Sequence, residues 1–172
     1  MFTCASIMPV RGQAPPDLLA RIKGLKCAKQ EGSVRVSYRM DGALGPEVRK
    51  NLERGIPVTF IHRLSVVRRR ALFFDKQLAR KTIEVTVSLD TLTQQYTLAK
   101  TIDGLPAETS TTDRAEEIGR WLTEVHDVVI PLPAEGDKGT IELRVKAEYE
   151  TNYFVFWVIP WSLRVIDAKE CR

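Results

Sequence analysis

The chain has 172 residues, of which 44% are hydrophobic and 28% charged, and its formal net charge is +4. This length suits one domain whose core needs neither a metal nor a disulfide, and the hydrophobic content argues against a disordered chain. The charge permits weak attraction to phosphates or anionic lipid but is too small for a nucleic-acid-binding protein. No apolar run reaches the roughly 18 residues of a membrane-spanning helix.

The N-terminal segment has two interpretations. Residues 1–14 are small and apolar, and Gly12-Gln13-Ala14 has the shape of a signal-peptidase site, although no charged region precedes it. We expect either an export signal whose front is missing or an uncleaved, disordered tail. Residues 15–32 are basic and punctuated by glycine, so we predict a linker. Residues 1–32 are therefore expected to be a signal remnant and linker, and residues 33–168 a single β-rich domain.

The first part of this domain is predicted to hold four strands and one helix. The strands are predicted from the alternation of apolar and polar residues. The expected strands are Ser33–Met40, Ile56–Arg68, Lys81–Leu89 and Gln94–Thr101, with a loop from Arg69 to Arg80. In the second strand, Val58, Phe60, Leu64 and Val66 share a face with His62. A short helix is expected from Pro46 to Arg54 because Pro46 suits a first turn and Gly55 a stop.

The second part is predicted to hold one helix and three further strands. Residues 103–110 are expected to form a loop, and Asp113 to start a helix through a capping box with Glu116. The expected strands are Val128–Leu132, Thr140–Glu150 and Ser162–Asp167, and Pro131 places the first at a sheet edge. These elements predict a mainly β fold, an antiparallel β-sandwich or strongly curled sheet of about seven strands with two short helices. A two-layer α+β fold is the alternative.

The sequence offers no catalytic, cofactor-binding or metal-binding set. His62 is expected to be a core imidazole with one hydrogen-bond partner. His126 is placed in the last turn of the second helix, where the helix dipole favours a partly charged ring. No nucleophile elbow and no phosphate-binding loop is present. An enzyme with an unrecognised polar site near His62 is the alternative.

Two stretches are candidate binding surfaces. At the expected hairpin tip, Arg68, Arg69 and Arg70 precede Phe73 and Phe74, a composition that suits anionic lipid headgroups. The alternative is a solvated turn whose phenylalanines fold back and whose Asp75 pairs with an arginine.

The second stretch is the aromatic run of residues 153–161, which includes Trp157 and Trp161. If exposed, it forms a recognition patch; if buried, which we expect, it fills the core.

Two cysteines flank the domain, Cys27 near its start and Cys171 at its end. Their spacing is not that of a zinc or redox site. We expect unpaired thiols on frayed termini; a disulfide in an oxidising compartment is the alternative.

Several short motifs carry a resemblance to a known family. They are Leu52–Phe60 (LERGIPVTF), Phe73-Phe74-Asp75 followed by Ala79-Arg80, Leu92–Tyr96 (LTQQY), and the late Trp157 and Trp161. From about Ser33 to Asp167, the chain resembles the bacterial family named domain of unknown function 4390. It departs from the family pattern at Ala71-Leu72, where aromatics are usual, and at Gln94, where arginine is usual. The resemblance implies an exported, periplasmic, β-rich protein and transfers no activity or catalytic residue.

We therefore predict a non-enzymatic exported domain, periplasmic or membrane-associated, that binds through a sheet surface or the hairpin tip. Its expected partner is another protein or an anionic membrane surface, with no cofactor, nucleic acid or identified small-molecule substrate. A cytoplasmic regulator is the alternative if the N-terminal segment stays on the chain.

Overall fold

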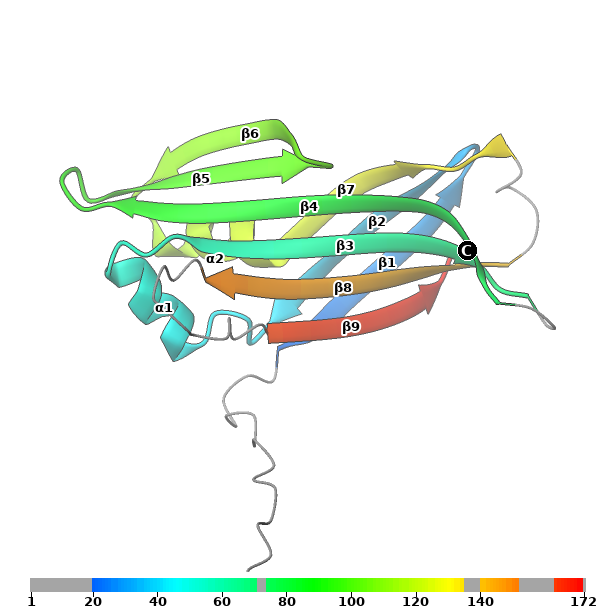
Figure 1. Ribbon diagram of the computed structural model, residues 1–172, viewed down its shortest axis with the longest axis horizontal. Helices are drawn as coiled ribbons and strands as arrows, with labels where there is room; N and C mark the ends of the chain where they lie inside the picture. The colour runs from blue at the N-terminus through cyan, green and yellow to red at the C-terminus, as the bar shows by residue number, and fades with distance from the viewer. Residues whose placement is uncertain (1–19, 71–73, 135–139, 152–162, 172) are drawn as a thin grey trace, which may run out of the picture.

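The structure is a computed structural model that describes residues 20–70, 74–134, 140–151 and 163–171. Within these residues, nine strands form two antiparallel sheets, and two short helices accompany them (Figure 1). The prediction of a mainly β fold with two helices is confirmed. The aromatic run at 153–161, with Trp157 and Trp161, lies outside the described residues.

The smaller sheet has the strand order β1-β2-β7, and the larger has the order β6-β5-β4-β3-β8-β9. The strands are β1 (Arg21–Gln30), β2 (Ser33–Asp41), β3 (Val58–Arg68), β4 (Lys76–Asp90), β5 (Gln95–Ile102), β6 (Leu105–Thr112), β7 (Glu124–Pro131), β8 (Ile141–Thr151) and β9 (Leu163–Glu170). The small sheet lies behind the large one in Figure 1, and its strands cross those of the large sheet at an angle. β7 is an edge strand, as Pro131 predicted.

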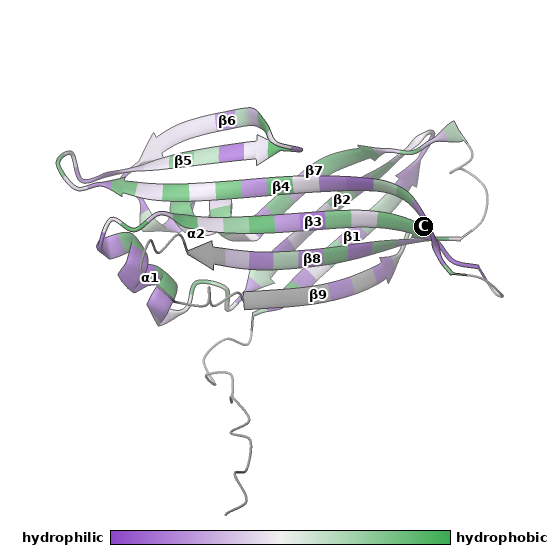
Figure 2. Ribbon diagram, in the orientation of Figure 1, coloured by the Kyte–Doolittle hydropathy of each residue, from purple (hydrophilic) through white to green (hydrophobic). Residues whose placement is uncertain are grey.

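The core lies between the sheets and follows the predicted alternation. Val34, Val36, Tyr38 and Met40 of β2 are buried, as are Val58, Phe60, His62, Leu64 and Val66 of β3. Figure 2 shows the corresponding alternation of hydrophobic and hydrophilic residues along β3 and β4. β2 and β3 therefore bury the faces that their sequences predicted.

β1 occupies a segment that was predicted to be a linker. Its alternation is broken at a bulge between Lys23 and Lys26, where Gly24 has a φ of 63°. Only Leu25 and Cys27 of this strand are fully buried. This segment is a strand because it pairs with β2. Its own sequence lacks the regular period-two pattern that would have predicted a strand.

β6 likewise replaces a predicted loop at 103–110. Asp103 and Gly104 have φ values of 52° and 81°, the pair of positive angles that a two-residue type I′ hairpin requires. Seven of the eight β6 residues are exposed or half-buried, so the strand lacks the apolar face that signals a strand in sequence. The predicted loop from Arg69 to Arg80 is also too long, because β4 begins at Lys76.

Both helices pack against the large sheet. In α1 (Pro46–Glu53), Val48 and Leu52 are buried. Asn51 of the same helix donates from Nδ2 to the Tyr149 hydroxyl at 3.0 Å. Gly55, with a φ of 74°, follows the helix end.

The second helix, α2 (Ala115–Thr123), starts later than predicted, and Asp113 and Glu116 do not form the capping box. Arg114 is the N-cap residue and makes no side-chain cap hydrogen bond. Instead, Thr112 Oγ1 donates to Glu117 Oε2 at 2.7 Å and accepts from the Arg114 N–H at 3.1 Å. Because α2 ends at Thr123, His126 lies in β7, and its predicted place at a helix C-terminus is wrong.

Candidate functional site

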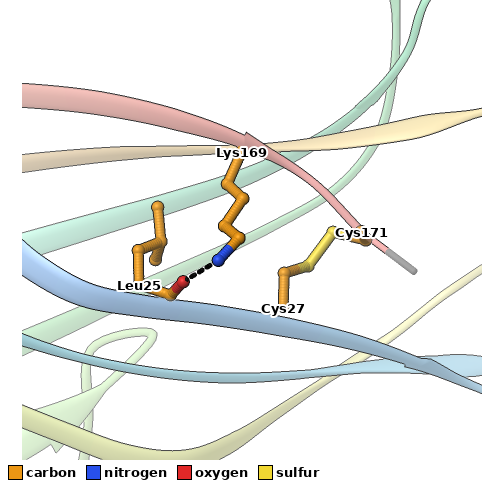
Figure 3. Close-up of a disulfide and its surroundings, with 4 residues drawn as sticks. All are labelled: Leu25, Cys27, Lys169 and Cys171. Carbon is orange, nitrogen blue, oxygen red and sulfur yellow. Dashed lines mark hydrogen bonds between the residues drawn. A yellow bond between two sulfur atoms is a disulfide. The ribbon is translucent and has the colours of Figure 1, made fainter.

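One side of the sandwich, which we call the closed edge, is held shut where β1 of the small sheet meets β9 of the large sheet. Cys27 and Cys171 form a disulfide there, with their Cα atoms 4.8 Å apart. Lys169 Nζ donates to the Leu25 carbonyl at 2.6 Å beside it (Figure 3). Both half-cystines are buried, so the expectation of free thiols on frayed termini is wrong.

The opposite side, which we call the open edge, is formed by β4, β5 and β6 of the large sheet and by β7 of the small sheet. A groove of about 460 Å³ lies here between the two sheets. Its apolar lining comes from β4, β5, β6 and β7, namely Ile83, Val85, Ile102, Ala107, Val125, Val128 and Val129. Charged residues border it, namely Lys81, Lys100, Glu108, Glu124 and Asp127, together with His126. An apolar lining with a few polar groups around it is the usual composition of a binding pocket.

A second hollow, of about 310 Å³, adjoins this groove where α2 meets β5 and β6. Lys100 lies between the two hollows and has two partners. Its Nζ is 3.0 Å from Glu108 Oε2 and 4.5 Å from the centre of the Trp121 ring. Glu117 and Arg120 complete the lining from α2. The open edge therefore offers an aromatic ring and charges of both signs.

Three hydrogen bonds engage polar atoms on the β7 side of the groove. Lys81 Nζ reaches from β4 and donates to the Val129 carbonyl at 2.7 Å. His126 Nε2 lies 2.9 Å from Glu124 Oε2. At Asp127, where φ is 48°, the backbone N–H donates to Ser37 Oγ at 2.9 Å.

His62 is enclosed in the core and has two hydrogen-bond partners rather than the one predicted. Its Nε2 lies 3.2 Å from the Leu122 carbonyl and its Nδ1 lies 2.8 Å from the Tyr38 hydroxyl. Burial lowers the pKa of His62 to about 4, although the hydrogen bond to Leu122 acts in the opposite direction. Arg63 points to the other face of the strand, where it pairs with Glu148.

The predicted arginine tip is only partly available for binding. Arg69 Nε is 3.0 Å from Glu142 Oε2, and Arg68 is half-buried, while Arg70 is exposed. Phe74 is 99% exposed, so it does not fold back. Phe73 lies outside the described residues.

Asp75, next to Phe74, pairs with an arginine as the solvated-turn interpretation predicted, but its partner is Arg144 of β8. The hydrogen bond from this guanidinium group lowers the pKa of Asp75.

Comparison with protein families identifies the chain. Residues 19–154 match the model described as Domain of unknown function (DUF4390). The chain belongs to the DUF4390 family. The family resemblance predicted from the motifs is confirmed, and the match begins before Ser33, so that it includes β1. No curated protein and no solved structure matches the chain.

The described part of this DUF4390 chain shows neither a cluster of metal ligands nor a membrane-spanning helix. No group of three or more His, Cys, Asp or Glu side chains in it is placed to hold a metal ion. Neither of its helices combines the length and apolar character needed to cross a membrane.

Sequence reasoning missed the open edge of this DUF4390 domain. Its residues come from β4, β5, β6, β7 and α2, which the chain separates and the sheet pairing brings together. One signal was present, because Asp103-Gly104 between Ile102 and Leu105 is a typical hairpin turn. Recognising that turn would have predicted β6, although not the groove beside it.

Proposed function

We propose that this DUF4390 chain is an exported, non-enzymatic binding domain that holds a partner protein at its open edge. The observation that carries the proposal is the difference between the two edges of the sandwich. The closed edge is covalently joined by Cys27 and Cys171, whereas the open edge presents a groove with an apolar lining. Val129 in this groove is 42% exposed. Burial of this apolar side chain by a partner would therefore favour binding.

Export is supported by the disulfide. Structural disulfides form and persist in oxidising compartments such as the periplasm. The pair joins β1 to the segment after β9, and both half-cystines are buried. This fits the interpretation of residues 1–14 as part of an export signal. If residues 1–14 stay on the chain, the alternative to an exported domain is a cytoplasmic regulator.

A binding role rather than catalysis is supported by the state of the two histidines. Both ring nitrogens of His62 are engaged inside the core, so a substrate would have to displace packed side chains to reach them. His126 is exposed and bonds to Glu124. Ser37 lines a hollow with these two residues, but its hydroxyl accepts from Asp127, and the described residues show no hydrogen bond between Ser37 and His126.

Site-specific photocrosslinking in the native host tests the proposal. A benzoylphenylalanine at Val129 faces the groove, and the same group at Ala28, an exposed position on β1, serves as the matched control. We expect a discrete covalent adduct with one protein from position 129 and none from position 28. Equal labelling at both positions, or none at either, would contradict the proposal.

Intact-mass analysis of the natively expressed protein tests export separately. We expect the periplasmic fraction to contain a chain that has lost residues 1–14. Its mass should increase by that of two hydrogens on reduction, because the disulfide between Cys27 and Cys171 opens. A full-length, reduced chain in the cytoplasm would contradict export and leave the binding groove in place.

A second candidate function is attachment to an anionic membrane surface through the hairpin tip. It is favoured by the full exposure of Phe74 close to Arg70. Guanidinium groups bind lipid phosphates, and an exposed ring can insert at headgroup depth. We expect Arg70→Ala to weaken co-sedimentation with vesicles of phosphatidylserine and phosphatidylcholine about fivefold, from roughly 1 kcal/mol per basic residue.

The matched control is Lys50→Ala, because Lys50 is exposed on α1, at the other end of the molecule from this tip (Figure 1). It should bind vesicles as the wild type does. Triple replacement of Arg68, Arg69 and Arg70 by alanine with unchanged co-sedimentation would remove this candidate.

A further inference from the structure

The two sheets end in four edge strands, namely β1 and β7 of the small sheet and β6 and β9 of the large sheet. An edge strand presents unpaired N–H and C=O groups to which another strand can add, and proteins usually block such edges. β1 and β9 meet at the closed edge, where the disulfide and the Lys169–Leu25 hydrogen bond join them.

Three features block the free edge of β7. Lys81 donates to the Val129 carbonyl, where the N–H of an added strand would otherwise donate. Asp127 sits at an irregularity in the pairing with β2, which distorts the strand there. Pro131 has no N–H to offer. A lysine, a bulge and a proline are the usual means of blocking an edge.

β6 is protected only in its first half. Pro106 lies there, and the pairing with β5 shifts between Lys100 and Thr101. From Thr109 to Thr112 the register is continuous, opposite Ala99 to Tyr96. This half, with the sequence TSTT, contains no lysine, proline or bulge, and its residues suit an extended strand. The lysine, the proline and the bulge that block β7 therefore have no counterpart in Thr109–Thr112.

The surroundings of this half-strand favour a basic partner. The inner face of β6 carries Glu108, Ser110 and Thr112, since residues alternate between faces and Thr112 is buried. Beside it lies the hollow of Trp121, whose other charged residues are Glu117, Glu124, Lys100 and Arg120. With Glu108, three carboxylates face two cations, so the hollow is net acidic on a chain of net charge +4.

We propose that Thr109–Thr112 of β6 is a docking site to which another protein adds an extended strand with basic side chains at alternate positions. The inference rests on the proposed function at the open edge and names its partner class. Backbone hydrogen bonds to β6 provide the affinity, and alternate side chains reach the hollow and select for positive charge. The Trp121 ring, already in contact with Lys100, is a suitable surface for a second cation.

A second copy of the chain fits this edge less well. Antiparallel self-pairing in one continuous sheet would place Glu108 of the second copy on the inner face as well. That would add a carboxylate to a hollow that already holds Glu117 and Glu124. Like charges in one site oppose binding.

Three labelled peptides and the full chain test the proposal. The first is Thr-Lys-Val-Lys-Val-Lys-Thr, the second has glutamate in place of each lysine, and the third is the lysine peptide with alternate backbone nitrogens methylated. We expect the lysine peptide to bind, to raise fluorescence anisotropy and to slow amide hydrogen exchange at Thr109–Thr112. The methylated peptide has the same charge but loses backbone donors, so it should bind at least tenfold more weakly, and the glutamate peptide should not bind.

A variant pair tests the role of the hollow. Glu117→Gln keeps an oxygen for the Thr112 hydroxyl but removes the charge, and it should weaken the lysine peptide about threefold. Glu47→Gln, an exposed change on α1, should leave binding unchanged.

Equal binding of the methylated and unmethylated lysine peptides, or no exchange protection at β6, would overturn the proposal. So would a dimer in sedimentation equilibrium whose β6 amides are protected without peptide, because a second copy would then be the occupant. If a partner crosslinks at Val129 but the methylated peptide binds as well as the unmethylated one, or β6 shows no exchange protection, the proposed function stands. In that case β6 is not its docking strand. Peptide binding at β6 with no adduct at Val129 would keep β6 as a docking strand and remove the groove at Val129 as the place where a native partner is held.

Discussion

Tyr38 of the small sheet and His62 of the large sheet are joined across the core, with 2.8 Å between the hydroxyl and Nδ1. The Leu122 carbonyl can only accept, so Nε2 of the neutral ring carries the hydrogen and Nδ1 accepts from Tyr38. One imidazole thus connects both sheets and α2. Its two hydrogen bonds satisfy both ring nitrogens inside the core.

Acid should destabilise the protein through His62. Its pKa is about 4 in the folded state against an ordinary value of 6.5, so between these values the unfolded chain binds more protons. The stability that the neutral ring contributes is present above pH 6.5 and is lost as the pH falls toward 4, by about 3 kcal/mol in total.

Urea unfolding measured from pH 7 to pH 4 checks this prediction. The His62→Gln variant should be less stable at pH 7 but should lose less stability on acidification than the wild type. Parallel pH profiles for the two proteins would contradict it.

Tyr38→Phe should lower the free energy of unfolding by about 1–3 kcal/mol, because Nδ1 of His62 is left buried without its donor. Tyr96→Phe is the control, since Tyr96 is half-buried and its hydroxyl makes no hydrogen bond within the described residues. That variant should stay within about 0.5 kcal/mol of the wild type. Equal losses in both variants would show that the contact with His62 adds nothing.

Opening the disulfide should lower the unfolding free energy by about 3–5 kcal/mol, because the bond closes a loop with a sequence separation of 144. Urea midpoints measured with and without reductant test this. A chain with both Cys27→Ala and Cys171→Ala should match the reduced wild type and should not respond to reductant. A wild type whose midpoint is unchanged by verified reduction would contradict the prediction.

The β5–β6 turn should depend on Asp103. Its Oδ1 accepts from the Thr82 N–H at 2.8 Å, and its φ is 52°. Asp103→Ala should cost about 1–2 kcal/mol, since alanine tolerates that angle poorly and offers no acceptor. Asp103→Asn, which retains both properties, should stay close to the wild type. Thermal unfolding of the pair measures the difference, and equal stability would contradict the role of the turn.

Local side-chain patterns were enough to predict the strands that bury one face. In β2, β3 and β8, apolar residues recur at every second position because those side chains enter the core between the sheets. The same pattern correctly placed His62 in the core. It also placed β7 at an edge, because Pro131 cannot donate to a ladder.

Other elements and contacts have no local signal and arise from the packing of distant strands. β6 has almost no buried face and the bulge at Gly24 breaks the alternation of β1, so both strands exist through the strands they pair with. Cys27 and Cys171 meet because β1 and β9 come together at one side of the sandwich. The open edge forms because the small sheet ends at β7 while β5 and β6 extend the large sheet. Local side-chain patterns record burial, whereas the meeting of distant strands depends on how the sheets pair and pack.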